Sequence, residues 1–530
     1  MMRRLATRRL WLLLWWVLLL SLVGCKREVE PEGVEAAAGP LQLRVAVREP
    51  GSLDPAFLGS SQDFLLAHQL HLSLFRWGDE AGKVVPALAR SWEVSPDGLV
   101  WTFELADGYR FSDGSAVEAR HVEGAWRRLL DPKVASPGAD ALKFLKGGLG
   151  GANSVRAQGA GRLVVELQRP LPWLPQVLAS PRFAAVSDEI LKRPEVDHSK
   201  LESGMVTSGP YQLGAWRPRE GCSLRPSGQW PGSGRWGGVE LLFAESEDAA
   251  MTWWRSKSVD LVVGLVPMAK VGELAKTSPE SVATFPLRSV YYLIPNVQRR
   301  ALSDADVRVS MAKSLERDRL VTRVLGAGQL PARGFLPPGY GDSLGLKHVE
   351  CFDRMAEPVK LSEATLKQLS GMELLCNSGE THKLIIEYLH SNLVEQLGLD
   401  LRLSLLEWNS YLNVASRHDF DIMRMSFTGS DDPLDILENF ATGNRNNYGG
   451  YSSAEYDAVL SRARQEANPE RRLAHLVEAQ EILCRDMPAL PVYVSSQVYL
   501  LGRGLKARLK PSQDGWFSLE YLSGGGAANP

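Results

Sequence analysis

The fold is decided by one stretch in the first fifth of the chain, residues 86–105, which read PALARSWEVSPDGLVWTFEL. Pro96, Asp97 and Gly98 form a turn, and the β-branched and aromatic residues that follow predict a strand over 100–105. Working outward, apolar periodicity predicts further strands at 41–47, 163–167, 401–406 and 491–500. The same criterion predicts helices at 64–75, 117–130, 306–325, 382–397, 454–464 and 470–484. Strands and helices are mixed throughout without an internal repeat, so the expected class is α/β.

The first residues predict export from the cytoplasm. Arg3, Arg4, Arg8 and Arg9 precede an apolar run over 10–23, which is typical of a secretion signal. The run ends in Leu-Val-Gly before Cys25, which resembles the bacterial lipobox and implies cleavage and lipidation at Cys25. We therefore expect a lipoprotein signal peptide at 1–24 and a lipidated cysteine with a flexible tether at 25–40. Lys26 resembles the residue that favours outer-membrane sorting in Gram-negative bacteria.

Composition excludes some classes of partner. About 500 residues follow the signal, enough for two or three domains. The net charge of −2 gives no reason to expect a nucleic-acid partner. Neither a CxxC nor a His/Cys cluster suggests a metal, and no cofactor is expected. Cys222, Cys351, Cys376 and Cys484 would meet an oxidising compartment, where three pairings are open to four cysteines.

A series of ordered blocks carries a family resemblance. They are residues 49–55, 86–98, 101–105, 111–119, 129–132, 135–137, 208–211, Tyr291-Tyr292 with Asn296, 306–308 with 317–319, 328–332 with 335–339, Glu407-Trp408 and Asp432-Pro433. In this order they resemble the peptide-binding family of ABC-importer solute receptors, the family 5 extracellular solute-binding proteins. Turn-forming blocks such as Phe111-Ser112-Asp113-Gly114 identify the fold without needing to touch a ligand.

The resemblance implies a three-lobed periplasmic-binding-protein fold, the Venus flytrap of type II and the large cluster C, with mixed sheets. Lobe I would comprise residues 41–78, 204–287 and 498–522, lobe II residues 79–203, and lobe III residues 288–497. A disordered tail would occupy 523–530. Ligand would bind between lobes I and III, which would close about a two-segment hinge.

A receptor for many peptides must hold what all peptides share: backbone amides, an ammonium and a carboxylate. Extended backbone can be paired as an added strand, and buried ends need opposite charges. By resemblance, 420–428 with Ser426 and Thr428 would pair the peptide backbone, and Arg424 and His382 would meet its carboxylate. The resemblance also assigns side-chain contacts to Phe427, Trp408, Tyr291, Tyr292 and Tyr493. Structural roles as core, ion-pair or surface residues remain open for Phe427, Trp408, Arg424 and His382.

The chain departs from the family near the ammonium end. The loop before Asp432-Pro433 is about one residue short, which puts Ser430 where the family has the Asp that binds the peptide ammonium. Asp431 is its neighbour and is expected to replace it. A second family Arg is Ala415 here, with Arg417 near, a family Tyr is Gly138, and Thr428 stands where one relative has a Cys. These departures put classical peptide specificity in doubt and leave the fold untouched.

The expected function is therefore a lipid-anchored, monomeric receptor that delivers oligopeptides to an ABC permease. It would lie in the cell envelope, either periplasmic on the inner or outer membrane, or on the outer surface of a Gram-positive cell. Alternatives are the same fold binding a dipeptide, cell-wall peptide, nickel complex, haem or oligosaccharide, a sensory receptor, or a surface hydrolase. Gly341-x-Ser343-x-Gly345 matches a nucleophile pattern, but a loop and not a strand precedes it, so no enzyme is expected. Ligand length, side-chain preference and the cognate permease are left open.

Overall fold

The described part of the protein covers most of the chain after the expected signal and tether. The computed structural model describes residues 42–78, 83–200, 204–230, 236–352, 359–502, 505–507, 519 and 522–524. The expected signal peptide, Cys25 and the tether lie outside the described residues. Of the expected tail, Ser523 and Gly524 belong to a short strand, and 525–530 are outside the described residues.

One long mixed sheet organises the described residues. Its strands follow the order β15 (Leu401–Leu406), β14 (Met372–Asn377), β16 (Ile422–Thr428), β12 (Val282–Pro295), β17 (Leu490–Leu501), β11 (Leu261–Val263), β1 (Gln42–Val47), β10 (Gly238–Phe243), β9 (Gly221–Pro226) and β8 (Tyr211–Arg217), with β13 (Leu330–Pro331) beside β17. β14 is parallel to β15 and β16, and β1 is parallel to β10 and β11. The remaining pairs are antiparallel.

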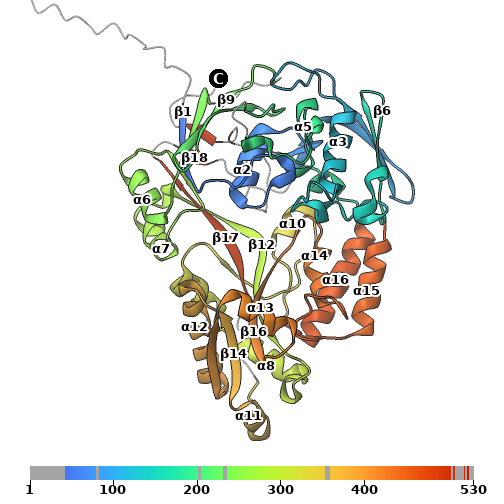
Figure 1. Cartoon of the computed structure of the whole chain (residues 1–530). Coiled ribbons are helices and arrows are strands. Elements are labelled where there is room, and N and C mark those ends of the chain that lie inside the picture. The colour runs from blue at the N-terminus through green and yellow to red at the C-terminus, as the bar shows by residue number, and fades with distance from the viewer. Residues whose placement is uncertain are drawn as a thin grey trace, which may run out of the picture. The chain divides into compact units, whose positions relative to one another are not determined.

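The two halves of this sheet are joined by β12 and β17, which lie side by side in Figure 1. Val282–Pro286 of β12 pairs with Ser496–Leu500, and Val290–Leu293 pairs with Leu490–Val494. Between Pro286 and Val290 the register shifts, so that residues 287–289 form a bulge opposite Ser495. A bulge bends a strand and re-aims its side chains. This break is therefore the natural place for the two halves of the sheet to bend relative to each other.

The fold-deciding stretch forms the start of a separate antiparallel sheet. Its order is β4 (Ala89–Val94), β5 (Val100–Leu105), β7 (Arg162–Glu166) and β6 (Val155–Gln158). In β5, buried and partly exposed residues alternate, as the period of a strand with one covered face requires. Two hairpins complete the strands: β2 (Phe75–Trp77) with β3 (Val84–Pro86), and β18 (Leu505–Ala507) with β19 (Leu522–Gly524).

The α-helices are α2 (Ser61–Leu70), α3 (Ala119–Leu130), α4 (Leu174–Val177), α5 (Asp188–Lys192), α6 (Glu247–Arg255), α7 (Met268–Thr277), α8 (Ala305–Ser314), α9 (Arg317–Arg319), α10 (Gly339–Leu344), α11 (Glu363–Leu369), α12 (Glu380–Leu397), α13 (Trp408–Ser416), α14 (Leu434–Leu437), α15 (Ala454–Gln465) and α16 (Pro469–Asp486). Local chemistry sets several ends: Ser60 and Asp63 form a capping box on α2, and Asn468 caps α16 ahead of Pro469. Among the described residues, no helix combines the length and apolar character that a membrane span requires.

The long helix predicted over 306–325 is broken in the structure. α8 ends at Ser314, the chain turns through Leu315 and Glu316, and α9 is followed by a π-helical stretch over Leu320–Leu325. The buried Arg317 explains the break, because its guanidinium donates to the carbonyl groups of Ala312 and Pro491. Tertiary hydrogen bonds to this arginine replace the continuous helix that local periodicity predicts.

Two of the four described cysteines are joined. Cys351 and Cys484 form a disulfide that links the loop after α10 to α16, whereas Cys222 and Cys376 are buried free thiols. The structure thus joins one pair of cysteines and leaves the other two free, whereas each of the three pairings left open by the sequence would join all four. The bridge spans 133 residues, a loop long enough to restrict the unfolded chain strongly.

We expect Cys351→Ser to lower the free energy of unfolding by roughly 2–4 kcal/mol, because the unfolded chain regains the entropy of a long loop. Urea denaturation with and without reductant measures this: reductant should destabilise the wild-type protein and leave the variant unchanged. Thiol labelling in denaturant without reductant should mark Cys222 and Cys376 and spare Cys351 and Cys484. Equal labelling of all four would contradict the assignment.

Candidate ligand-binding site

A cavity of about 1300 Å³ opens beside the bulge of β12. Three parts of the chain line it. The first contributes Phe64, His68 and Trp77; the second contributes Asp140, Ala141, Lys143, Phe144, Arg169, Leu171, Gln176, Val177, Ser180, Arg182 and Phe183; the third contributes 287–289, 425–432, Asp435, Glu438, Asn439, 444–446, Tyr448 and Ser495. Of the residues that the sequence singles out, Ser426, Phe427, Thr428, Ser430 and Asp431 lie in this lining.

One face of the long sheet continues from the cavity. Alternation along β12, β16 and β17 places Ser289 opposite Thr428, and Tyr291 opposite both Ser426 and Tyr493. The Thr428 hydroxyl donates to Ser289 Oγ at 3.0 Å, and the rings of Tyr291 and Tyr493 stack with centroids 4.9 Å apart. Arg424 stands on the same face of β16. A polar strip therefore runs along the sheet from the cavity lining to Arg424.

The other face of β16 belongs to the core. Phe427 and Tyr292 pack with Phe335 and Phe440, and the Tyr292 hydroxyl donates to the Phe335 carbonyl at 2.6 Å. Tyr292 is fully buried, whereas Phe427 reaches the cavity with part of its ring. Arg417 ends α13 as an exposed residue outside the cavity lining.

Arg424 is a buried cation without a nearby carboxylate. Its Nε donates to Asn377 Oδ1 at 2.6 Å, its Nη2 donates to the same oxygen, and Nη2 lies 3.2 Å from His382 Nε2. Its guanidinium carbon lies between 5.6 and 5.9 Å from the ring centroids of Tyr291, Trp408 and Tyr411. No acidic group of the described residues lies within ion-pair distance of it. A buried charge left in this state is costly, and an incoming anion relieves the cost.

His382 completes the anion-accepting arrangement. Burial, reinforced by Arg424, lowers the pKa of His382 to about 4, so the ring is neutral at pH 7. Because the Arg424 guanidinium can only donate, His382 Nε2 accepts and the proton sits on Nδ1. That Nδ1 is buried and has no acceptor in the part of the chain that the structure describes. Arg424 and His382 together therefore offer donors suited to a ligand carboxylate.

The topology explains why these side chains meet. Asn377 is the last residue of β14, Trp408 follows β15, and both strands are parallel. Ligands of open α/β sheets bind outside the carboxyl ends of such strands. His382 lies in the first turn of α12, where the helix dipole also favours a negative group. Trp408 is 43% exposed beside Arg424, a position from which it can cover a ligand.

Asp431 is already paired. Its carboxylate binds Nη1 of Arg288, a residue of the β12 bulge that is 1% exposed and whose guanidinium lies 5.2 Å from the Tyr340 ring centroid. Removing one partner of such a buried pair costs roughly 3–5 kcal/mol. The expectation that Asp431 binds a ligand ammonium remains a prediction, and it requires the carboxylate to leave Arg288. Neighbouring Ser430 is also engaged, since its hydroxyl donates to Asp435 and accepts from the Asp432 amide.

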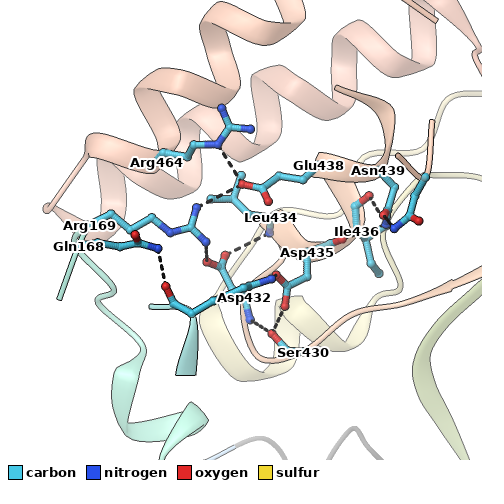
Figure 2. A network of polar contacts seen from close by, with 12 residues as sticks. Gln168, Arg169, Ser430, Asp432, Leu434, Asp435, Ile436, Glu438, Asn439 and Arg464 are labelled. Carbon is cyan, nitrogen blue, oxygen red and sulfur yellow. Dashed lines mark hydrogen bonds and ion pairs between the residues drawn. The ribbon is translucent and has the colours of Figure 1, made fainter. Parts of the chain in front are cut away.

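The remaining acids of the lining form a network that Figure 2 shows around Arg169. Asp432 binds Arg472 at 3.0 Å and Arg169 at 3.7 Å, and Glu438 binds Arg169 at 3.2 Å and Arg464 at 2.9 Å. Burial raises the pKa of Asp432, against the opposing attraction of Arg472. These pairs join the segment before α4 to α14, α15 and α16. The charges of Asp432 and Glu438 therefore stabilise the cavity wall and are not available to a ligand.

Sequence reasoning missed Arg288 and Asn377, which decide the electrostatics of the site. Arg288 reads as one more residue of a strand, and its only signal is a charge within a mainly apolar segment. Asn377 follows the apolar run of β14, where a polar residue at a strand end is weak evidence of a site. Neither signal tells which acid or guanidinium the residue will meet.

Comparisons with known proteins identify the family of this chain. The family model for bacterial extracellular solute-binding proteins, family 5, matches residues 83–448. The oligopeptide-binding protein OppA of Bacillus subtilis is 25% identical over 507 residues, covering 91% of this chain and 92% of that protein. The probable deoxycholate-binding periplasmic protein YgiS of Escherichia coli is 28% identical over 477 residues, covering 86% and 88%.

Solved structures show the same fold. The murein tripeptide-binding protein MppA in its unliganded open form is 25% identical to this chain, covers 92% of it over 98% of its own length, and superposes with a TM-score of 0.78. The expected fold class, a mixed α/β protein of the periplasmic-binding type, is confirmed. So is the family resemblance, and the chain belongs to family 5 of the bacterial extracellular solute-binding proteins.

Proposed function

We propose that this chain is the receptor of an ABC importer and that it captures short peptides by their carboxylate end. The proposal rests mainly on Arg424, a buried guanidinium that has no carboxylate partner among the described residues. Arg424 lies at the end of a polar strip that leads to a cavity of about 1300 Å³. Relatives named for oligopeptide and murein-peptide binding support the ligand class. We further propose that the receptor is anchored in the cell envelope and works as a monomer with a membrane permease.

The backbone of the peptide would pair with β16. β14 pairs with this strand only at Ile422 and Met423, so Arg424–Thr428 carries outward amides that no strand of the described residues covers. An extended ligand can add to such an edge, which provides affinity without demanding a particular sequence. Tyr291, Tyr493 and Trp408 would pack against its side chains.

Closure would occur at the break between the two halves of β12. Ligand that contacts both walls of the cavity favours the closed arrangement by its difference in affinity for the two states. Lobes I and III, with the boundaries inferred from sequence, would move about the segments near 286–290 and Ser495. The closed form would then be recognised by the permease.

A second candidate is an amphipathic anion that is not a peptide. A relative 28% identical is named for deoxycholate binding, and the cavity wall holds Phe64, Phe144, Phe183 and Leu171. Native mass spectrometry of protein purified from its own host distinguishes the two, because a set of peptide masses would support the first candidate and a single non-peptide mass the second.

A hydrolase is the less favoured class. Ser343 lies inside the short helix α10, and its hydroxyl donates to the Gly339 carbonyl at 3.1 Å. A nucleophile elbow places its serine between a strand and a helix, with the oxygen exposed. This geometry supports reading Gly341-x-Ser343-x-Gly345 as part of a packed turn.

We expect Arg424→Gln to weaken binding of a tetrapeptide by about 10–100-fold, the scale of a charge-assisted hydrogen bond in a desolvated site. Calorimetric titration with tetra-alanine and its carboxyl-terminal amide measures it. The wild-type protein should prefer the free acid, and the variant should bind both equally. Arg323→Gln, a change of an exposed arginine in the π-helical stretch Leu320–Leu325, is the control. An undiminished preference in Arg424→Gln would exclude the assigned role.

The neutral state of His382 predicts a pH dependence of stability. Because the folded-state pKa is about 4 and the unfolded value about 6.5, the unfolded chain binds more protons between these values. The contribution of His382 to the free energy of unfolding should therefore be greatest above pH 6.5 and should fall as the pH drops toward 4. Partly buried His68 and buried His71, with pKa values of about 3 and about 4, add to the same slope.

Chemical denaturation of ligand-free protein at several pH values between 4 and 7 measures the slope. His382→Gln should flatten it partly, leaving the share of His68 and His71. An identical slope in the variant would mean that His382 titrates alike in both states and does not accept from Arg424.

Lipid anchoring at Cys25 predicts a covalent modification. Cells grown with an alkyne-tagged fatty acid should yield labelled protein, because acyl chains on this cysteine hold the receptor at the membrane. Cys25→Ser should be unlabelled, whereas Cys222→Ala should remain labelled. Label retained by the Cys25 variant would refute the anchor site.

A further inference from the structure

The charges in the cavity lining are not evenly balanced. Five acids line it, and four of them are paired: Asp431 with Arg288, Asp432 with Arg169 and Arg472, Asp435 with Lys143, and Glu438 with Arg169 and Arg464. The fifth, Asp140, is exposed to solvent, as is the lining cation Arg445. Water screens exposed charges strongly, so these two contribute little. The partly buried Arg182 remains.

Arg182 has no carboxylate within ion-pair distance among the described residues. Its Nη2 donates to the Leu58 carbonyl at 2.9 Å, and its guanidinium carbon lies 4.9 Å from the centroid of the Phe64 ring. Its Nη1 is buried and lacks an acceptor in the described part of the chain. A buried donor without an acceptor destabilises the protein until a ligand oxygen reaches it.

Gly138 makes room for this arginine. A Cβ atom on Gly138 would lie 1.4 Å from Arg182 Nη1, so any side chain there would expel the guanidinium. Arg182 therefore occupies space that only glycine at 138 leaves open. Burial lowers the pKa of Arg182, with Asp63 opposing the change, which agrees with a charge that the protein only partly compensates.

The surroundings of Arg182 strengthen its interactions. Phe64, Phe144, Phe183 and Val177 share the lining with it, and His68 is neutral because burial lowers its pKa to about 3. These apolar neighbours exclude water from one side of the guanidinium, and an ionic contact is stronger where water is excluded. At the same time Asp431, the acid that would meet an ammonium, is held by the buried Arg288.

We propose that this receptor selects ligands that carry a negative charge to Arg182 and need no free ammonium, such as peptides whose amino end bears a carboxylate-containing acyl group. The inference rests on the proposed function for the peptide class. It adds that the cavity prefers a negative charge at the amino end of the peptide. Arg182 is the specificity-determining residue, Gly138 admits it, and the Arg288–Asp431 pair removes the competing ammonium site.

The test uses three peptides that differ only at the amino end: tetra-alanine, N-acetyl-tetra-alanine and N-succinyl-tetra-alanine. Calorimetric titration of the wild-type protein should give similar affinities for the first two and about tenfold tighter binding of the succinylated peptide. Arg182→Gln should bring the three affinities within about twofold, while Arg182→Lys should keep part of the preference. Arg323→Gln should behave as wild type. Thermal unfolding shows whether each variant is folded. If Arg182→Gln is destabilised, the affinities of Arg182→Lys for the three peptides are compared with those of the wild-type protein instead.

The opposite ranking would overturn the proposal. If free tetra-alanine binds about tenfold more tightly than the acetylated peptide, and Asp431→Asn removes that advantage, then Asp431 is an ammonium anchor after all.

A failure of the peptide proposal is distinguishable. If none of the three peptides binds, decanoate and decylamine, which share an apolar chain and differ in charge, test the charge preference alone. Thermal stabilisation by decanoate and not by decylamine, lost in Arg182→Gln, would support the inference and reject peptides as ligands. Stabilisation by decylamine alone, or by neither compound, would reject the inference.

Discussion

The pairing of β12 with β17 is the constraint on which the rest of the structure depends. Both strands cross from one half of the long sheet to the other, and their pairing continues on either side of the bulge at 287–289. The ladder keeps the two halves in register, and the break puts Ser289, Ser495 and Arg288 at the wall of the cavity. Under the proposed closure, the bending point and the cavity wall coincide at this bulge.

The buried arginines differ in their partners, and this difference indicates which of them can meet a ligand. Three of them form ion pairs within the fold: Arg128 with Asp54, Arg472 with Asp432, and Arg288 with Asp431. Arg308 and Arg317 instead donate to backbone carbonyl groups. Buried Arg424 and partly buried Arg182 differ from the ion-paired arginines, because each lacks a carboxylate partner among the described residues. Arg182 lines the cavity, and Arg424 lies at the end of the polar strip that leads from it. An arginine that the fold leaves uncompensated is the one available to a ligand.

Local pattern predicted the regular elements well where the chain follows its own propensity. The strands over 100–105 and 401–406 match β5 and β15 to the residue, and the helices near the end match α15 and α16 within two residues. The prediction of one helix over 306–325 failed because Arg317 donates to the Pro491 carbonyl on β17, which lies 174 residues away in the chain. No local pattern contains that contact.

The sequence by itself determined the family and the α/β class, because turn residues, periodicity and ordered motifs are local properties. By resemblance it also predicted a site near Arg424, His382 and the 426–431 segment. Only the tertiary structure decided which face of β16 meets the cavity, and thereby placed Tyr292 in the core and Tyr291 on the polar strip. It also decided that Asp431 meets Arg288 and that Cys351 meets Cys484. Charge pairing depends on distance in space, and residues 143 positions apart in the chain become neighbours only when the sheet has formed.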